Sequence, residues 1–202
     1  MIRNIIFDMG NVLIRYAPEY FIERAGIEDL QDKALLLKEI YHSPKWALMD
    51  YGKLNEEEFE EDLLSRLPAH LHQVVPELLR HWNLPEPIPG MAEFIAECKN
   101  ANLGIYLLSN ASLRQPEYWP KVPGHEFFDG TVISAIEGCV KPSLEIFQRL
   151  LKLFCLKAEE CFFIDDMAEN VDGAKRAGID GYVFDGDIAA LRSILSSLGV
   201  GL

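Results

Sequence analysis

Short apolar runs alternate with helical patterns over most of the chain. The first run, Ile5-Ile6-Phe7, ends abruptly at Asp8, as expected for a central parallel strand that is covered on both faces. Four further strands are predicted at 105–109, 130–134, 161–166 and 181–184, and helices at 91–100, 142–153, 168–177 and 187–198. Strands that alternate with helices predict an α/β fold, in which helices cover both faces of a parallel five-stranded sheet.

The segment 16–87 follows a different pattern. It contains no strand pattern and is rich in Glu, Leu and Lys at helical spacing, which predicts helices over 30–41, 55–64 and 70–82. Asn55 suits an N-cap, because acidic residues fill the turn after it. The segment ends among Pro85, Pro87 and Pro89, as is common at a domain boundary. We therefore predict a helical domain at 16–87, inserted into a core formed by 1–15 and 88–202.

Polar residues stand at the ends of three predicted strands. The first strand ends at Asp8, the second at Ser109-Asn110 and the fourth at Asp165-Asp166, while Lys141 precedes a predicted helix. The carboxyl ends of parallel strands share one edge of the sheet, which is where open α/β sheets bind ligands. Taken singly, these residues are also ordinary turn, capping or surface residues. Together they indicate a site for a hard divalent cation and an anionic group.

Composition narrows the classes of partner and compartment. The formal net charge is −13 with no basic stripe, so we expect no nucleic acid partner. The four cysteines form no CxxC pair, and we interpret them as reduced, mostly buried thiols. We find neither a signal peptide pattern nor an apolar run of membrane-spanning length, so the expected compartment is the cytoplasm.

The order of the motifs resembles that of the haloacid dehalogenase superfamily of hydrolases. The motifs are Asp8-Met9-Gly10-Asn11-Val12, Ser109-Asn110, Lys141-Pro142 and Phe163-Ile164-Asp165-Asp166, followed by Asn170. The helical insert is similar to the small cap domain of the first cap class in that superfamily. The resemblance implies a Rossmann-like three-layer core with the first and fourth strands adjacent, plus this helical cap.

The resemblance also implies a role for each motif. Asp8 would be the nucleophile that forms an aspartyl-phosphate. Asp8, the backbone carbonyl of Gly10, and Asp165 or Asp166 would hold Mg²⁺. The implied phosphate-binding residues are Met9, Ser109, Asn110 and Lys141, of which Ser109 and Lys141 also count as catalytic.

Gly10 departs from the pattern of most phosphatases in this superfamily. They carry a second aspartate, two positions after the nucleophile, as general acid and base. The pattern Asp-x-Gly-Asn-Val is instead similar to a sugar-phosphatase branch that includes bacterial α-glucose-1-phosphate phosphatases. A cap residue or metal-bound water would have to replace the missing acid, and the sequence offers four cap candidates: His42, Asp50, Tyr51 and Glu57.

Three functions fit these features. The first is a Mg²⁺-dependent phosphatase acting on a small phosphorylated metabolite, for which we expect a sugar phosphate. The second is a 2-haloacid dehalogenase that uses Asp8 without a metal, and the third is a catalytically weak relative that binds a ligand or partner. The paired carboxylates Asp165-Asp166 favour the phosphatase, because a dehalogenase needs no metal. The cap residues Tyr41, Trp46, Met49 and Tyr51 form either an aromatic wall over the site or the core of the cap.

Overall fold

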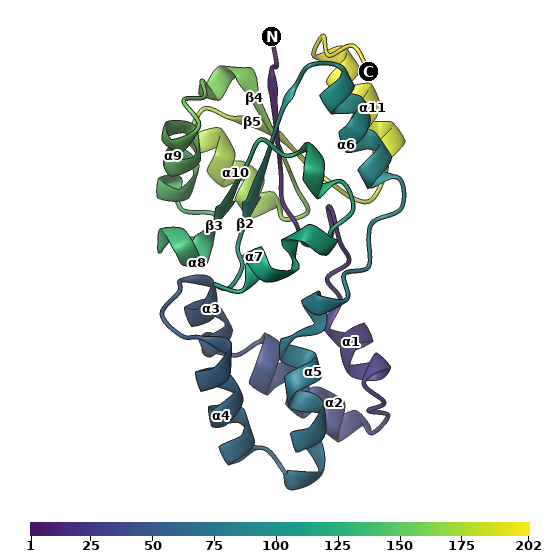
Figure 1. Cartoon of the computed structure of the whole chain (residues 1–202), viewed down its shortest axis with the longest axis vertical. Coiled ribbons are helices and arrows are strands. Elements are labelled where there is room, and N and C mark those ends of the chain that lie inside the picture. Colours follow the sequence, from purple (N-terminus) through teal and green to yellow (C-terminus); the bar gives the residue numbers. More distant parts are fainter.

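Five parallel strands form a single sheet in the order β3-β2-β1-β4-β5 in the computed structural model, which describes all 202 residues (Figure 1). The strands are β1 (Asn4–Phe7), β2 (Gly104–Ser109), β3 (Gly130–Ile133), β4 (Cys161–Asp165) and β5 (Asp180–Val183). Phe7 at the end of β1 pairs with Leu107 of β2 and with Ile164 of β4. The predicted five-stranded parallel sheet is thus confirmed, and β1 lies beside β4 as the resemblance implies.

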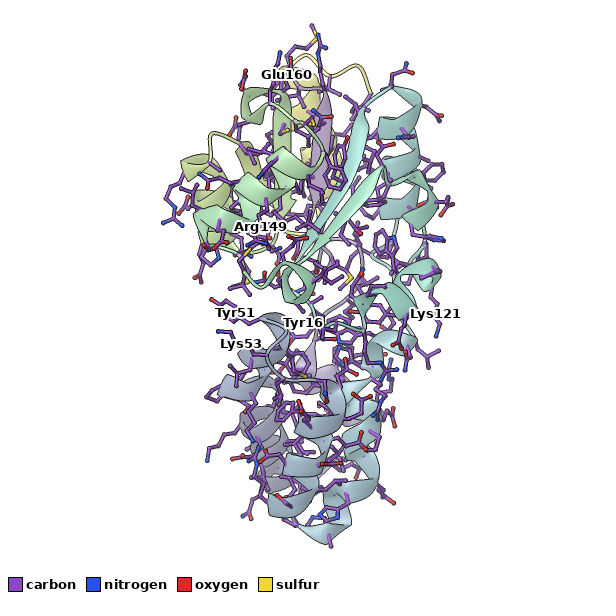
Figure 2. All side chains as sticks on the ribbon, turned by 60° about the vertical axis from the view of Figure 1, so that its left-hand side comes forward. Tyr16, Tyr51, Lys53, Lys121, Arg149 and Glu160 are labelled. Atoms are coloured by element: carbon purple, nitrogen blue, oxygen red, sulfur yellow. The ribbon has the colours of Figure 1, made fainter.

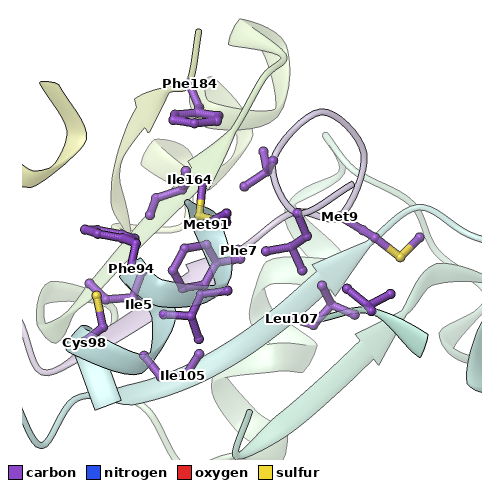
Figure 3. Packing of buried hydrophobic residues seen from close by; sticks show 14 of the residues in the cluster. Ile5, Phe7, Met9, Met91, Phe94, Cys98, Ile105, Leu107, Ile164 and Phe184 are labelled. Carbon is purple, nitrogen blue, oxygen red and sulfur yellow. The ribbon is translucent and has the colours of Figure 1, made fainter. Parts of the chain in front are cut away.

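Helices cover both faces of the sheet, which gives the three layers. One face carries α6 (Met91–Asn100) and α11 (Ile188–Ser197), and the other carries α9 (Leu144–Leu153) and α10 (Ala168–Arg176). Successive strand residues point to opposite faces. Ile5 and Phe7 accordingly pack against Met91 and Phe94 of α6 (Figure 3), whereas Ile6 packs in the cluster of the other face.

The segment between β1 and α6 is helical and has its own buried core. Its helices are α1 (Pro18–Arg24), α2 (Leu30–Leu36) with a π-helical continuation (Leu37–Tyr41), α3 (Pro44–Asp50), α4 (Glu56–Arg66) and α5 (Val75–Leu79). Fourteen buried apolar residues, from Phe21 to Leu79, form a cluster separate from the two that flank the sheet. Figure 1 shows these helices grouped apart from the sheet. We propose that 16–87 is a separate domain, and we call it the cap.

The two connections between core and cap run side by side. Arg15 N–H donates to the Glu86 carbonyl at 2.8 Å, and Ile88 N–H donates to the Leu13 carbonyl at 2.9 Å. Ile14 and Pro87 also form an antiparallel bridge. These hydrogen bonds tie the entry and exit of the cap together, which supports a boundary near 15 and 87.

Two of the predicted helices differ from the observed ones in continuity or in their first residue. The segment 70–82 is not one helix: a 3₁₀ turn (Ala69–Val74) leads into α5, and a second one (His81–Asn83) follows. Pro76 explains the break, because it has no N–H to donate within a helix and is tolerated only in the first turn, where α5 places it. The helix predicted from Pro142 begins at Leu144 instead, since Ser143 Oγ accepts a hydrogen bond from Glu145 N–H.

Two short helices that the sequence patterns did not predict follow β2 and β3. They are α7 (Gln115–Tyr118) and α8 (Ser134–Glu137), and each is a single turn. A four-residue helix carries too little periodicity to be recognised from sequence. None of the helices combines the length and apolarity needed to cross a membrane.

All four cysteines are free thiols. Cys98, Cys139 and Cys161 are buried, in agreement with the prediction. Cys155 is exposed and is the one exception to this prediction. It follows the C-terminal end of α9 with φ of 55°, in the turn that leads out of the helix.

Candidate active site

The polar residues at the strand ends border one cavity of about 210 Å³, which is also lined by residues of the cap and of core segments such as α7. The residues expected from the sequence that line it are Asp8, Met9, Gly10, Ser109, Asn110, Lys141 and Asp166. Asp165 does not line the cavity, because it is fully buried behind Lys141. The shared edge of a parallel sheet therefore brings these residues together, although they are up to 158 positions apart in the chain (Asp8 to Asp166).

Lys141 lies between two carboxylates. Its Nζ is 2.6 Å from Asp8 Oδ1 and 2.7 Å from Asp165 Oδ2, and its side chain is almost fully buried. Burial alone would lower the pKa of Lys141, but Asp8 and Asp165 outweigh burial and raise that pKa above its usual value. Lys141 is therefore a fixed cation at the base of the cavity.

Both oxygens of Asp165 are already used by protein donors. Oδ1 accepts hydrogen bonds from Met167 N–H at 2.8 Å and from Asn170 Nδ2 at 3.0 Å, while Oδ2 accepts from Lys141 Nζ. A carboxylate with this many donors is a poor candidate for direct metal binding. Asp165 instead holds Lys141 in place.

Asp8 and Asp166 have free coordination capacity. Asp166 is half-buried, pairs with no cation, and accepts one side-chain hydrogen bond, from Asn11 Nδ2 at 2.9 Å. Burial raises the pKa of Asp8 to about 7, while Lys141 acts in the opposite direction. A further cation beside Asp8 would favour the ionised carboxylate that a nucleophile requires.

The donor set suits a divalent cation that prefers oxygen. One carboxylate oxygen from each of Asp8, Asp165 and Asp166 lies within 4.8 Å of the others. Three carboxylates against one lysine leave a formal charge of −2 when all are ionised, which a divalent ion would neutralise. Mg²⁺ needs only one or two carboxylates, because it keeps several waters. The residues present therefore fit Mg²⁺.

The loop after β2 links Ser109 and Asn110, for which we expect a role in phosphate binding, to Lys141. Asn110 Nδ2 donates to the Lys141 carbonyl at 3.1 Å, and Lys141 N–H donates to Asn110 Oδ1 at 2.9 Å. The Asn110 side chain is thus committed to the backbone of Lys141. Ser109 is buried at the cavity wall, and its hydroxyl makes only a long 3.5 Å contact with the Asn110 carbonyl.

The opposite wall of the cavity is aromatic and apolar. It is formed by Tyr16, Trp46, Met49, Leu79, Trp82 and Tyr118. Tyr16 and Trp82 stack with ring centroids 5.4 Å apart. Trp46 and Met49 therefore belong to the wall, whereas Tyr41 is buried in the core of the cap and Tyr51 does not line the cavity. Tyr16 and Leu79 were missed from sequence, because only the docking of cap on core identifies them.

Asp50 is the only one of the four cap candidates for the missing acid that lines the cavity. His42, Tyr51 and Glu57 do not reach it. Figure 2 shows Tyr51 and Lys53 at the outer edge of the cap, whereas Tyr16 lies inside, between cap and sheet. The structure thus separates candidates that the sequence left equivalent.

Glu56 joins the cap to the loop after β2 and was also missed from sequence. Its carboxylate accepts hydrogen bonds from Ser112 Oγ at 2.7 Å and from Arg114 Nη1 at 3.1 Å. Burial raises the pKa of Glu56, against the effect of both donors. The sequence indicated only that Glu56 was an acid in the first turn of a helix. Its contacts hold the cap against the anion-binding loop.

Several named relatives of this chain are phosphatases. The sesquiterpene phosphatase of Aspergillus oryzae is 27% identical over 201 residues, which cover 96% of this chain and 95% of that protein. A glyceraldehyde 3-phosphate phosphatase of Methanocaldococcus jannaschii is 25% identical over 89% of this chain and 83% of its own length.

Solved structures share the fold. A haloacid dehalogenase family enzyme of Bacteroides thetaiotaomicron, determined with magnesium and inorganic phosphate, superposes with a TM-score of 0.73 at 21% identity over 95% of this chain and 99% of that one. Residues 2–178 match the family of haloacid dehalogenase-like hydrolases. The family match covers every motif at the sheet edge and the cap between them, and the chain therefore belongs to the haloacid dehalogenase-like hydrolases.

Proposed function

We propose that the chain is a Mg²⁺-dependent phosphatase that hydrolyses a small phosphorylated metabolite through an aspartyl-phosphate on Asp8. The observation that carries the proposal is the contact of Lys141 with Asp8, next to the unpaired carboxylate of Asp166. A carboxylate nucleophile beside a fixed cation suits attack on an anionic phosphate ester. The phosphatase relatives support the same reaction.

Each residue of the site contributes a defined interaction. Asp8 attacks phosphorus, and Lys141 offsets the repulsion between this carboxylate and the phosphate oxygens. The Ser109 hydroxyl, Met9 and Asn110 line the cavity, and we expect them to surround the phosphoryl oxygens of a bound substrate. Asp8, the Gly10 carbonyl and Asp166 would hold Mg²⁺, which supplies positive charge to the phosphoryl group. Asp165 acts through Lys141 and is a positioning residue.

For the leaving group we propose a sugar, because aromatic side chains stack on sugar rings and the cavity also offers polar groups such as Asn11, Asp50 and Ser112.

A second candidate substrate is the monophosphate of an apolar alcohol. The aromatic and apolar wall of the cavity, which includes Tyr16 and Tyr118, favours this second candidate, because apolar surface stabilises a bound hydrocarbon. The similarity to a sesquiterpene phosphatase points to the same class.

We expect phosphate release from one class of ester in a substrate panel, and only with Mg²⁺. The panel compares sugar phosphates, prenyl monophosphates and aryl phosphates, each assayed with Mg²⁺ and with excess chelator, alongside chloride release from a 2-haloacid. Full phosphate release in the chelator would contradict the proposed metal dependence. Chloride release without metal would identify a dehalogenase.

The two adjacent aspartates are expected to respond differently to amide substitution. Asp166→Asn should raise the Mg²⁺ concentration for half-maximal activity by at least about tenfold, because it removes a charged metal ligand. Asp165→Asn should lower kcat even at saturating Mg²⁺, because the position 2.7 Å from Lys141 loses the negative charge that holds the ammonium in place. Titration of activity with Mg²⁺ measures both effects. Identical Mg²⁺ curves for the two variants would contradict this division of roles.

A further inference from the structure

The core of this site offers no proton donor for the leaving oxygen. Gly10 stands where most phosphatases of the superfamily carry their second aspartate. The space at this position nevertheless admits a side chain. A Cβ built on Gly10 would lie 3.5 Å from Tyr16 Cβ, an ordinary van der Waals distance. Steric exclusion therefore does not explain the absence of an acid at position 10. A proton donor has to come from another wall of the cavity.

Most titratable groups on the cavity wall are already committed. Glu56 accepts hydrogen bonds from Ser112 and Arg114, and Lys141 is held between two carboxylates. Burial raises the pKa of Tyr16 and of Tyr118 above the usual tyrosine value, so neither phenol is suited to exchange a proton near neutral pH. Apart from the nucleophile and the proposed metal ligands, Asp50 remains.

Asp50 is a carboxyl with no protein partner, and α3 directs it into the cavity. Trp46, Met49 and Asp50 all line the cavity, as expected for positions i, i+3 and i+4 on one helix face. No protein group donates a hydrogen bond to the Asp50 carboxylate, and its oxygens are not sealed in the protein interior. Burial raises the pKa of Asp50 to about 7; Lys141 opposes this shift and Asp8 adds to it. Asp50 thus lies within electrostatic reach of both groups.

Gly52 fixes Asp50 relative to the core. The turn after α3 contacts α8, and the two helices lie next to each other in Figure 1. Gly52 has φ of 65°, and a Cβ at this position would lie 2.2 Å from the Ala135 carbonyl oxygen. Only glycine permits this approach between the two backbones. The contact anchors the C-terminal end of α3, and with it Asp50, over the edge of the sheet.

We propose that Asp50 is the general acid and general base of the reaction, in place of the acid that is missing at position 10. The inference rests on the proposed phosphatase function. In the first step Asp8 bonds to phosphorus, the bond from phosphorus to the leaving oxygen breaks, and that oxygen takes the proton of the Asp50 carboxyl. In the second step water attacks phosphorus, the bond to Asp8 breaks, and the proton of the water returns to Asp50.

The test is a leaving-group series in the wild type and in Asp50→Asn, with aryl phosphates of graded phenol acidity and one alkyl phosphate. In the variant we expect a loss of roughly 100-fold or more in kcat/KM for the alkyl phosphate and little loss for the most acidic phenol. The same variant should release a burst of phenol before slow phosphate release, because the second step also lacks its base. The wild type should show a shallow series and no burst.

Two further variants separate a proton-transfer role from a structural one. Asp50→Glu keeps the carboxyl and should keep the shallow series. Glu61→Gln is the matched control, because it removes an exposed carboxyl of the cap. An equal loss on every ester in Asp50→Asn, or no loss, would overturn the role of Asp50 while leaving the phosphatase proposal intact. A wild type that releases phosphate from none of the esters would overturn both.

Discussion

Asp8→Asn is expected to lower the rate of phosphate release by on the order of a thousandfold or more, while the protein stays folded. The amide is a far poorer nucleophile than the carboxylate and has nearly the same size. Its oxygen can still accept a hydrogen bond from Lys141 Nζ, which lies 2.6 Å from Asp8 Oδ1. The substitution leaves Lys141 paired with Asp165, so the lysine keeps one buried carboxylate and the packing of the site is preserved.

Three measurements and one control make this test specific. Phosphate release gives the loss of turnover, and acid-quenched wild type incubated with labelled substrate should retain protein-bound phosphate that the variant lacks. Asp172→Asn is the control, because it removes an exposed carboxyl of α10 that does not line the cavity. Thermal unfolding should give a similar Tm for all three proteins. Turnover of Asp8→Asn above a few per cent of wild type would remove Asp8 from its role as nucleophile.

The residues of the core site were predictable because their signal is local. An apolar run that ends in a carboxylate marks both the strand and the end at which ligands bind, and parallel pairing then brings these ends together. Asp8, Ser109 and Lys141 were therefore identified from short segments of sequence. The convergence of Asp8 and Ser109 needed no knowledge of the connecting loops, whereas Lys141 itself lies in the connection before α9.

The division of roles between Asp165 and Asp166 was not predictable in the same way. Consecutive residues at a strand end point in opposite directions, so adjacent aspartates meet different surroundings. Which of them faces Lys141 depends on where that residue lies, and Lys141 comes from another loop. The sequence therefore left open which of the two would bind the metal, whereas their contacts distinguish them.

The cap residues were the least predictable, because their roles depend on how the cap docks. Asp50 and Tyr51 are neighbours in sequence, yet only Asp50 lines the cavity. The docking depends on the backbone contact at Gly52 and on the hydrogen bonds of Glu56. Neither leaves a periodic pattern in the sequence.

Lys141→Ala is expected to lose both activity and stability. It removes the cation beside nucleophile and phosphate, which we expect to lower kcat/KM by roughly 100- to 1,000-fold. It also leaves Asp8 and Asp165 buried without their shared partner, which should lower the free energy of unfolding by about 3–5 kcal/mol. Phosphate release and urea unfolding measure the two losses. Wild-type behaviour in both would make Lys141 irrelevant to the site.

The loss of stability in Lys141→Ala should depend on pH. Lys141 lowers the pKa of Asp8, so its removal raises that pKa further above the value of about 7 that burial sets in the wild type. A carboxyl whose pKa is raised by folding stabilises the protein below its unfolded pKa and loses that contribution as the pH rises through its folded pKa. The deficit of the variant relative to wild type should therefore grow as the pH rises above about 7, and should be constant below it, because Asp8 is then protonated in both folded proteins. A deficit that does not change with pH would mean that Lys141 contributes packing rather than charge.

Lys141→Arg distinguishes charge from fit at the same position. The guanidinium keeps the positive charge, so the pH-dependent part of the deficit should largely disappear. It is larger and planar, however, and must enter a site where the lysine side chain is only 1% exposed. We therefore expect a residual loss of stability that does not vary with pH, and a loss of kcat smaller than in Lys141→Ala. If the arginine variant instead matches the alanine variant in kcat and in pH dependence, the site requires the geometry of the Lys141 ammonium at 2.6–2.7 Å from both carboxylates, and charge alone does not suffice.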